Sequence, residues 1–199
     1  MSKILYYYSV MSPWSYLGLP RLLNIASKFN LEIEEKPIDL VGKVFPSTGG
    51  VAVPQRHISR QNYRLLELKR WGEFLKININ IKPKFFPVKD PHTPALFCIA
   101  SISLGRKIDF GFKLLENLWS LEKDISELEI LKTISNNLQL DFNKLKELAS
   151  SDKIKKIYED NSSQAIHDEI FGVPMYIFKG EKFWGQDRLE LLEYKIKNS

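Results

Sequence analysis

The chain of 199 residues contains one cysteine, Cys98. A single cysteine cannot close an intramolecular disulfide or form a Cys-x-x-Cys pair, so dithiol redox chemistry within this chain is excluded. Cys98 lies in the apolar run ALFCIASISLG, and we expect it to be a small buried core residue. Histidine is also scarce, and His57, His92 and His167 have no ligand-like spacing to cysteine or to carboxylates. The sequence therefore predicts no metal site.

Long apolar runs are absent, and the excess of one charge is small. No segment approaches the ~18 unbroken apolar residues of a membrane span, and the start MSKILYYYSV lacks the features of a secretory leader. We therefore expect a cytosolic protein without membrane contact. The net charge of +5 comes from basic residues interleaved with acidic ones, which is typical of a solvated surface rather than of a nucleic-acid-binding face.

The two ends of the chain carry the clearest structural patterns. Residues 3–9 predict a buried strand, 13–28 a helix that Pro20 should kink, and 31–39 a second strand. Near the other end, 173–178 predicts a strand that turns at 179–181 into a hairpin ending at Trp184, and a final amphipathic helix starts at Gln186. The ends thus predict β-α-β and β-β-α units, which together make one sheet flanked by helices.

The middle of the chain is predicted to be helical. The stretch GKVFPSTGGVAVP has no helical period and is long enough to be a functional loop. Ser126 with Glu129 predicts a capping box, and Asp141 predicts a further helix cap. The length fits one domain or one domain with a large insertion. The predicted helices cover residues 55–75, 93–104, 108–121, 127–138, 142–149 and 152–168.

Three short stretches carry candidate chemistry. Ser12-Pro13 fits a helix cap followed by the first helical residue, but the same helix start offers N–H groups, a partial positive charge and a hydroxyl to an anion such as a ligand thiolate. Val173-Pro174 fits an ordinary strand start. Gln186-Asp187 fits a first helical turn, or a receptor for an ammonium or amino-acid group. Each stretch alone is explained by structure without function.

In this order and spacing, the three stretches resemble the family of 2-hydroxychromene-2-carboxylate isomerases and kappa-class glutathione transferases, a DsbA-like branch of the thioredoxin folds. The resemblance covers the whole chain, through SPWSYLGLPRL, the 42–60 loop with its VPQR, KDIS after Trp119, and FGVPMYIFKGEKFWGQDRLELL. It implies an α/β thioredoxin-like fold with an inserted all-helical domain. Residues 1–41 and 170–199 would form the thioredoxin-like domain, and 42–169 the loop and helical insertion.

The resemblance also implies roles for individual residues in binding glutathione. Ser12 matches the serine whose hydroxyl faces the glutathione sulfur. Val173, before an expected cis-Pro174, matches the residue whose N–H and C=O pair with the cysteinyl part of glutathione.

The two remaining parts of glutathione are assigned in the same way. Gln186 and Asp187 match the pair that receives the γ-glutamyl group, and Arg56 falls where a basic residue approaches the glycyl carboxylate. Ser9 and Gly50 depart from the family, which frequently has aspartate and asparagine at these positions.

Aromatic residues could line a pocket for the second substrate. Trp and Phe are more often core residues than pocket residues, and Trp14 is the preferred pocket residue because it follows Ser12-Pro13. The candidates are Trp14, Phe45, Phe85, Phe86 and Trp119.

The resemblance implies a cytosolic, homodimeric, glutathione-dependent isomerase of the 2-hydroxychromene-2-carboxylate type, acting on a small aromatic or electrophilic substrate. A kappa-class-like glutathione S-transferase and a cysteine-less thioredoxin-fold binding module remain alternatives.

Overall fold

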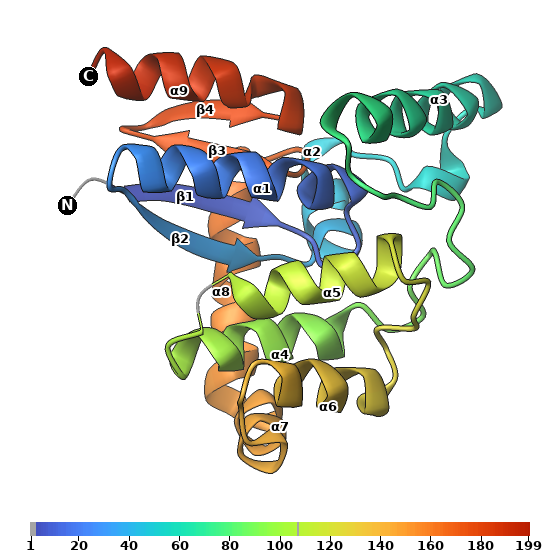
Figure 1. Ribbon diagram of the computed structural model, residues 1–199, viewed down its shortest axis with the longest axis vertical. Helices are drawn as coiled ribbons and strands as arrows, with labels where there is room; N and C mark the ends of the chain where they lie inside the picture. Colours follow the sequence, from blue (N-terminus) through green and yellow to red (C-terminus); the bar gives the residue numbers. More distant parts are fainter. Residues whose placement is uncertain (1–2, 107) are drawn as a thin grey trace.

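A computed structural model describes residues 3–106 and 108–199. Its centre is a four-stranded mixed sheet with strand order β2-β1-β3-β4 (Figure 1). The first two strands pair in parallel, and β3 runs antiparallel to both β1 and β4. The predicted α/β arrangement, with β-α-β at the start and β-β-α at the end, is confirmed. The strands are β1 (Lys3–Tyr8), β2 (Glu32–Pro37), β3 (Met175–Phe178) and β4 (Glu181–Trp184).

The central strand β1 buries side chains on both faces of the sheet. Tyr6 and Tyr8 join the larger hydrophobic cluster, together with residues of α1 (Pro13–Lys28) and α9 (Leu189–Lys197). Tyr7 points to the opposite face and joins a smaller cluster. This alternation follows from the period of two in a strand. Helix α1 has the predicted bounds and is continuous through Pro20.

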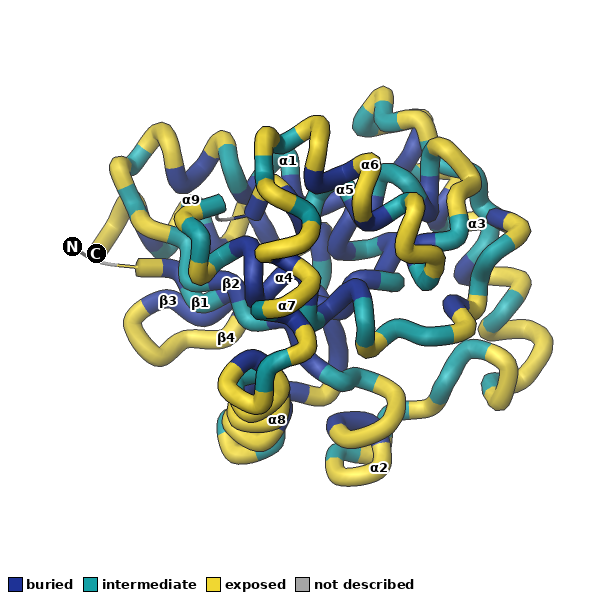
Figure 2. The backbone as a smooth tube through the Cα atoms, turned by 90° about the horizontal axis from the view of Figure 1, so that it is seen from below, coloured by how far each residue is buried: buried dark blue, intermediate teal, exposed yellow. Residues whose placement is uncertain are grey.

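The middle of the chain forms helices that pack beside and beneath the sheet (Figure 1). Figure 2 shows β1 and β3 largely buried and α8 with mainly exposed turns. Side chains of α4 to α7 share the larger cluster with β1 and α1, so one core joins the helices to the sheet. The division into 1–41 with 170–199 and 42–169 stays a prediction. The helices are α3 (Ile58–Leu75), α4 (His92–Ser103), α5 (Asp109–Trp119), α6 (Leu128–Asn137), α7 (Phe142–Ser150) and α8 (Asp152–His167).

The segment predicted to be an irregular loop contains helical turns instead. A π-helical turn covers Leu40–Val44, α2 covers Phe45–Thr48, and a 3-10 turn covers Val53–Gln55. The Asp39 carboxylate accepts from the Gly42 N–H at 2.8 Å and caps the first of these turns. Such turns arise from local hydrogen bonds, so they leave no helical period in the sequence.

The two predicted caps in the helical region have different outcomes. The capping box at Ser126 is wrong, because α6 begins at Leu128 and the Ser126 hydroxyl accepts instead from the Asp90 N–H at 3.1 Å. The Asp141 cap is confirmed, since its carboxylate accepts from the Lys144 N–H at 3.0 Å. Among the helices of the described residues, none has the length and apolar composition needed to cross a bilayer.

Candidate functional site

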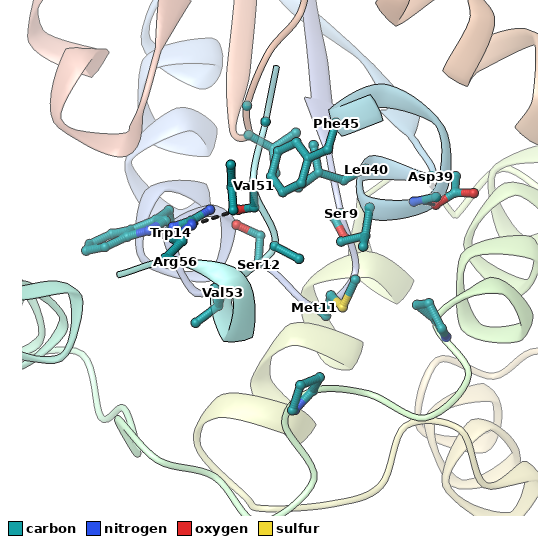
Figure 3. A pocket seen from close by; sticks show the side chains of 18 of the residues that line it. Ser9, Met11, Ser12, Trp14, Asp39, Leu40, Phe45, Val51, Val53 and Arg56 are labelled. Carbon is teal, nitrogen blue, oxygen red and sulfur yellow. Dashed lines mark hydrogen bonds between the residues drawn. The ribbon is translucent and has the colours of Figure 1, made fainter. Parts of the chain in front are cut away.

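A cavity of about 720 Å³ lies at the amino-terminal end of α1. Its walls come from the start of α1, the 39–56 segment, the first turns of α3, the 86–92 segment and the 171–173 segment. Figure 3 shows Ser12 among the side chains that surround the cavity, between Trp14 with Arg56 on one side and Ser9 on the other. Segments far apart in sequence therefore meet at the helix start.

Ser12 caps α1 and keeps its hydroxyl proton free. Its Oγ accepts from the Ser15 N–H at 3.2 Å, and its own N–H donates to the Ser9 carbonyl at 3.0 Å. The predicted cap, with Pro13 as the first helical residue, is confirmed. Within the described residues the Ser12 hydroxyl donates no hydrogen bond, so it retains a proton to offer to a ligand.

Val173 lies on the wall of the same cavity, and its peptide bond to Pro174 is cis, as the resemblance implied. Among the described residues, no partner accepts from the Val173 N–H or donates to its C=O. Buried peptide groups are normally paired. Val173 is itself buried, so its N–H and C=O are peptide groups that lack a protein partner among the described residues.

Arg56 and Trp14 also line the cavity, as predicted for a glycyl-carboxylate partner and a pocket aromatic. The Arg56 Nε donates to the Val51 carbonyl at 2.7 Å (Figure 3), and the outer guanidinium nitrogens have no hydrogen-bond partner among the described residues. Partial burial lowers the pKa of Arg56, and the neighbouring charge of Arg60 lowers it further.

The other aromatic candidates divide between the cavity and the core. Phe45 and Phe86 line the cavity. Phe85 and Trp119 do not line it, which agrees with the core alternative that the sequence favoured. Phe85 packs against the main core, and Trp119 is fully buried with its ring 5.0 Å from that of Phe86. Trp119 therefore supports the cavity wall from behind.

Gln186 and Asp187 lie next to the cavity wall but outside the residues that line it. The Gln186 side chain is buried, and both its amide oxygen and its backbone carbonyl accept hydrogen bonds from Arg21. The Asp187 carboxylate is exposed and lies 2.9 Å from the Arg188 guanidinium. Trp184, two residues earlier, does line the cavity.

The departure at Gly50 has a steric cause. A Cβ added at Gly50 would lie 2.0 Å from the Phe45 ring, so a side chain at this position would require the ring to move. Phe45 therefore fills the space that an asparagine side chain would need. The second departure, Ser9, is buried on the cavity wall.

Two arginines of α3 that the sequence reasoning missed also line the cavity. Arg60 and Arg64 are four residues apart and lie on one face of the helix. Arg64 is only 8% exposed, and its guanidinium lies 5.1 Å from the Phe86 ring centroid and 5.6 Å from that of Trp119. Burial, and then the charge of Arg56, lowers the pKa of Arg64 to about 10. The spacing of four residues between Arg60 and Arg64 in the predicted helix 55–75 could have indicated that both lie on one face.

The lone cysteine lies away from the cavity. Cys98 is buried in the core, as predicted, and burial raises the pKa of its thiol. Among the described residues, no group of three or more histidine, cysteine, aspartate or glutamate side chains is placed to hold a metal ion.

The four-stranded sheet with its helices defines a thioredoxin-like domain in which the start of α1, capped by Ser12, faces the cavity. The chain belongs to the family of DsbA-like thioredoxin domains, whose model matches residues 3–197. It is 28% identical to 2-hydroxychromene-2-carboxylate isomerase of Pseudomonas sp. (strain C18), over 96% of this chain and 88% of that protein. It is 22% identical to glutathione S-transferase kappa 1 of Rattus norvegicus, also over 96% of this chain and 88% of that protein.

A solved structure shows the same fold. A selenomethionine structure of 2-hydroxychromene-2-carboxylate isomerase superposes with a TM-score of 0.82 at 22% identity, covering 98% of this chain and 94% of the other. The predicted family and fold class, a thioredoxin-like fold with inserted helices, are confirmed. The named relatives are enzymes, in agreement with the prediction of an enzyme.

Proposed function

We propose that this protein is a glutathione-dependent isomerase of the 2-hydroxychromene-2-carboxylate type. The observation that carries the proposal is the Ser12 hydroxyl, which lies at the start of α1 on the wall of the cavity and keeps its proton free. The names of the curated relatives support the class of reaction.

The energies suffice for Ser12 to hold a ligand thiol as a thiolate. A free thiol has a pKa of about 8.5, and lowering it by roughly two units requires about 2.7 kcal/mol. A hydrogen bond from a hydroxyl to a charged group contributes about 1.5–3 kcal/mol, and a helix start adds about 0.3–1 kcal/mol. Serine cannot form a mixed disulfide, so the thiolate stays available.

The residues around Ser12 fit the parts of glutathione. Val173 offers an unpaired N–H and C=O on the cavity wall, which suit the cysteinyl peptide unit. Arg56 offers its outer nitrogens to the glycyl carboxylate. The γ-glutamyl group would reach past Trp184 to the start of the final helical turn, where the exposed Asp187 carboxylate suits its ammonium. Gln186 would contribute its main-chain N–H, because its carbonyl and its amide oxygen are bonded to Arg21.

When bound beside Ser12, glutathione would supply a thiolate nucleophile for reversible conjugate addition to the substrate, and it would be regenerated rather than consumed. The chain contributes the hydroxyl of Ser12, which stabilises the negative sulfur before addition and after release. Trp14 and Phe86 provide apolar walls for an aromatic body. We also retain the cytosolic location and the homodimer as predictions of this proposal.

A kappa-class-like glutathione transferase is the second candidate, because the same residues would hold the thiolate for transfer to an electrophile. Incubation with glutathione and 2-hydroxychromene-2-carboxylate, beside a generic electrophile, separates the two. The isomerase proposal predicts isomer formation at constant glutathione, whereas glutathione consumption without isomer would indicate a transferase. Calorimetry that detects no glutathione binding at millimolar ligand would contradict both and favour a cysteine-less binding module.

A further inference from the structure

Arg64 is a buried cation that has no anionic partner among the residues that the structure describes. Only 8% of the residue is exposed, and one terminal nitrogen of its guanidinium is fully buried with no hydrogen-bond partner among the described residues. No carboxylate in the described chain forms an ion pair with it. Because an unpaired buried charge is strongly unfavourable, such a group is expected where a ligand supplies the counter-charge.

The surroundings of Arg64 hold it in place and offer it no acceptor. The rings of Phe86 and Trp119 pack against the guanidinium, as in a cation–π arrangement. The Trp119 indole N–H is a second buried donor without a partner in the described residues. Asp39 is the one carboxylate among the described cavity residues, and it is occupied as the cap of Gly42. The part of the cavity wall at Arg64 therefore attracts anions.

The position of Arg64 suits a ligand with an apolar body. A smaller cavity of about 260 Å³ adjoins the main one, and Arg64, Phe86 and Pro87 line both. The anion at Arg64 would thus sit among aromatic and proline side chains. Arg56, in contrast, is partly exposed, which suits the more hydrated glycyl carboxylate of glutathione.

We propose that Arg64 is a specificity-determining residue that binds the carboxylate of the second, non-thiol substrate and selects conjugated aromatic acids over their neutral analogues. This inference rests on the proposed function, since it names the partner of the thiolate in the same cavity. The planar fork of a guanidinium matches a carboxylate through two parallel hydrogen bonds.

The test measures binding of cinnamate, a conjugated aromatic acid, and of cinnamamide, its neutral analogue, by calorimetry without glutathione. The wild-type protein should bind cinnamate about 10- to 100-fold more tightly than cinnamamide, the range expected for a charged hydrogen-bonded pair. Arg64→Gln should lose this preference and leave cinnamamide binding unchanged. Equal binding of the two probes by the wild-type protein, or unchanged cinnamate binding by Arg64→Gln, would overturn the proposal.

Two further variants serve as controls for the Arg64→Gln measurement. Arg70→Gln is the matched control, because Arg70 is on the same helix, is exposed and pairs with Glu67 away from the cavity. It should bind cinnamate like the wild-type protein. Arg64→Lys keeps the positive charge but lacks the planar guanidinium, so it should retain part of the preference for cinnamate. This variant also tests the proposal if Arg64→Gln does not fold. A lysine variant without any preference for cinnamate would count against the proposal.

Separate glutathione titrations distinguish this inference from the proposed function. If glutathione does not bind but the acid preference depends on Arg64, the proposed function fails and the anion site stands. If glutathione binds and turnover occurs while Arg64→Gln keeps the full acid preference, the anion site fails and the proposed function stands.

Discussion

The two helix starts that carry candidate chemistry differ in what their polar groups already bind. At the start of α1, the Ser12 hydroxyl lies on the cavity wall, and among the described residues it bonds only to the Ser15 N–H of the first turn. At the 3-10 turn Gln186–Arg188, which precedes α9, the Gln186 side chain is buried and its amide oxygen accepts from Arg21. In both places a polar residue follows a strand, so the local sequence is similar. The two side chains differ in bonding because Gln186 has a partner, Arg21, that is distant in sequence.

We call the helix start at Gln186 the closed start, because its side chain is buried and bonded, and the start at Ser12 the open start. The closed start is part of the packing between α1 and the end of the chain. A Cβ at Gly18 would lie 3.0 Å from the Gln186 Cβ and 2.6 Å from the Tyr176 hydroxyl, so glycine allows the two segments to approach. Arg21, one turn later on α1, then reaches Gln186. The start at Gln186 therefore connects α1 to the end of the chain, whereas the start at Ser12 faces the cavity.

Removing the hydroxyl at the open start should have the largest effect. Ser12→Ala is expected to lower turnover about 10- to 100-fold, because the thiolate loses a charged hydrogen bond of about 1.5–3 kcal/mol. Glutathione affinity, measured by calorimetry, should change far less, since Val173 and Arg56 remain. Steady-state kinetics with saturating glutathione checks the turnover.

Ser15→Ala is the matched control for this change. Ser15 lies in the same first turn and is buried, but it does not line the cavity. Its turnover should equal that of the wild-type protein. Equal losses in the two serine variants would show that the first turn, rather than the Ser12 hydroxyl, is what matters.

Breaking the closed start should reduce stability rather than ligand binding. Gln186→Ala removes an acceptor from the partly buried Arg21 guanidinium, so the free energy of unfolding should fall by about 1–3 kcal/mol. Chemical denaturation measures the loss, with the exposed Gln164→Ala as control. A large loss of glutathione affinity at unchanged stability would mean that the Gln186 amide turns toward the ligand.

Asp187 should give the smallest of these effects. Asp187→Asn removes one exposed carboxylate near the expected γ-glutamyl ammonium, which should weaken glutathione binding about fivefold, or about 1 kcal/mol. Calorimetry measures this change, and Asp160→Asn on α8 controls for the lost surface charge. Affinity equal to that of the wild-type protein would place the γ-glutamyl group elsewhere.

The sequence predicted those features that depend on local patterns. Strands β1 and β3 follow from short apolar runs, and the bounds of α1 follow from the Ser-Pro start and its apolar period. The Ser12 cap is local and was predicted, and Val173-Pro174 was placed by resemblance. These features need no knowledge of distant segments.

The features that sequence reasoning missed depend on distant partners. Ser126 was predicted to cap a helix, but its hydroxyl is bonded to the backbone of Asp90. The guanidinium of Arg64 is buried against the rings of Phe86 and Trp119, which belong to other segments of the chain. No local window shows that a charged residue in a helix will be buried against two aromatic rings.

The most direct test of the central claim is the pKa of the glutathione thiol in the complex, followed by the ultraviolet absorbance of the thiolate as pH is varied. A hydrogen bond to the charged form lowers a pKa, so the wild-type protein should hold the thiol well below its free value of about 8.5. Ser12→Ala should raise that pKa by roughly one to two units, and Ser15→Ala should not change it. Identical titration curves for the wild-type protein and Ser12→Ala would contradict the claim and leave Ser12 as a helix cap alone.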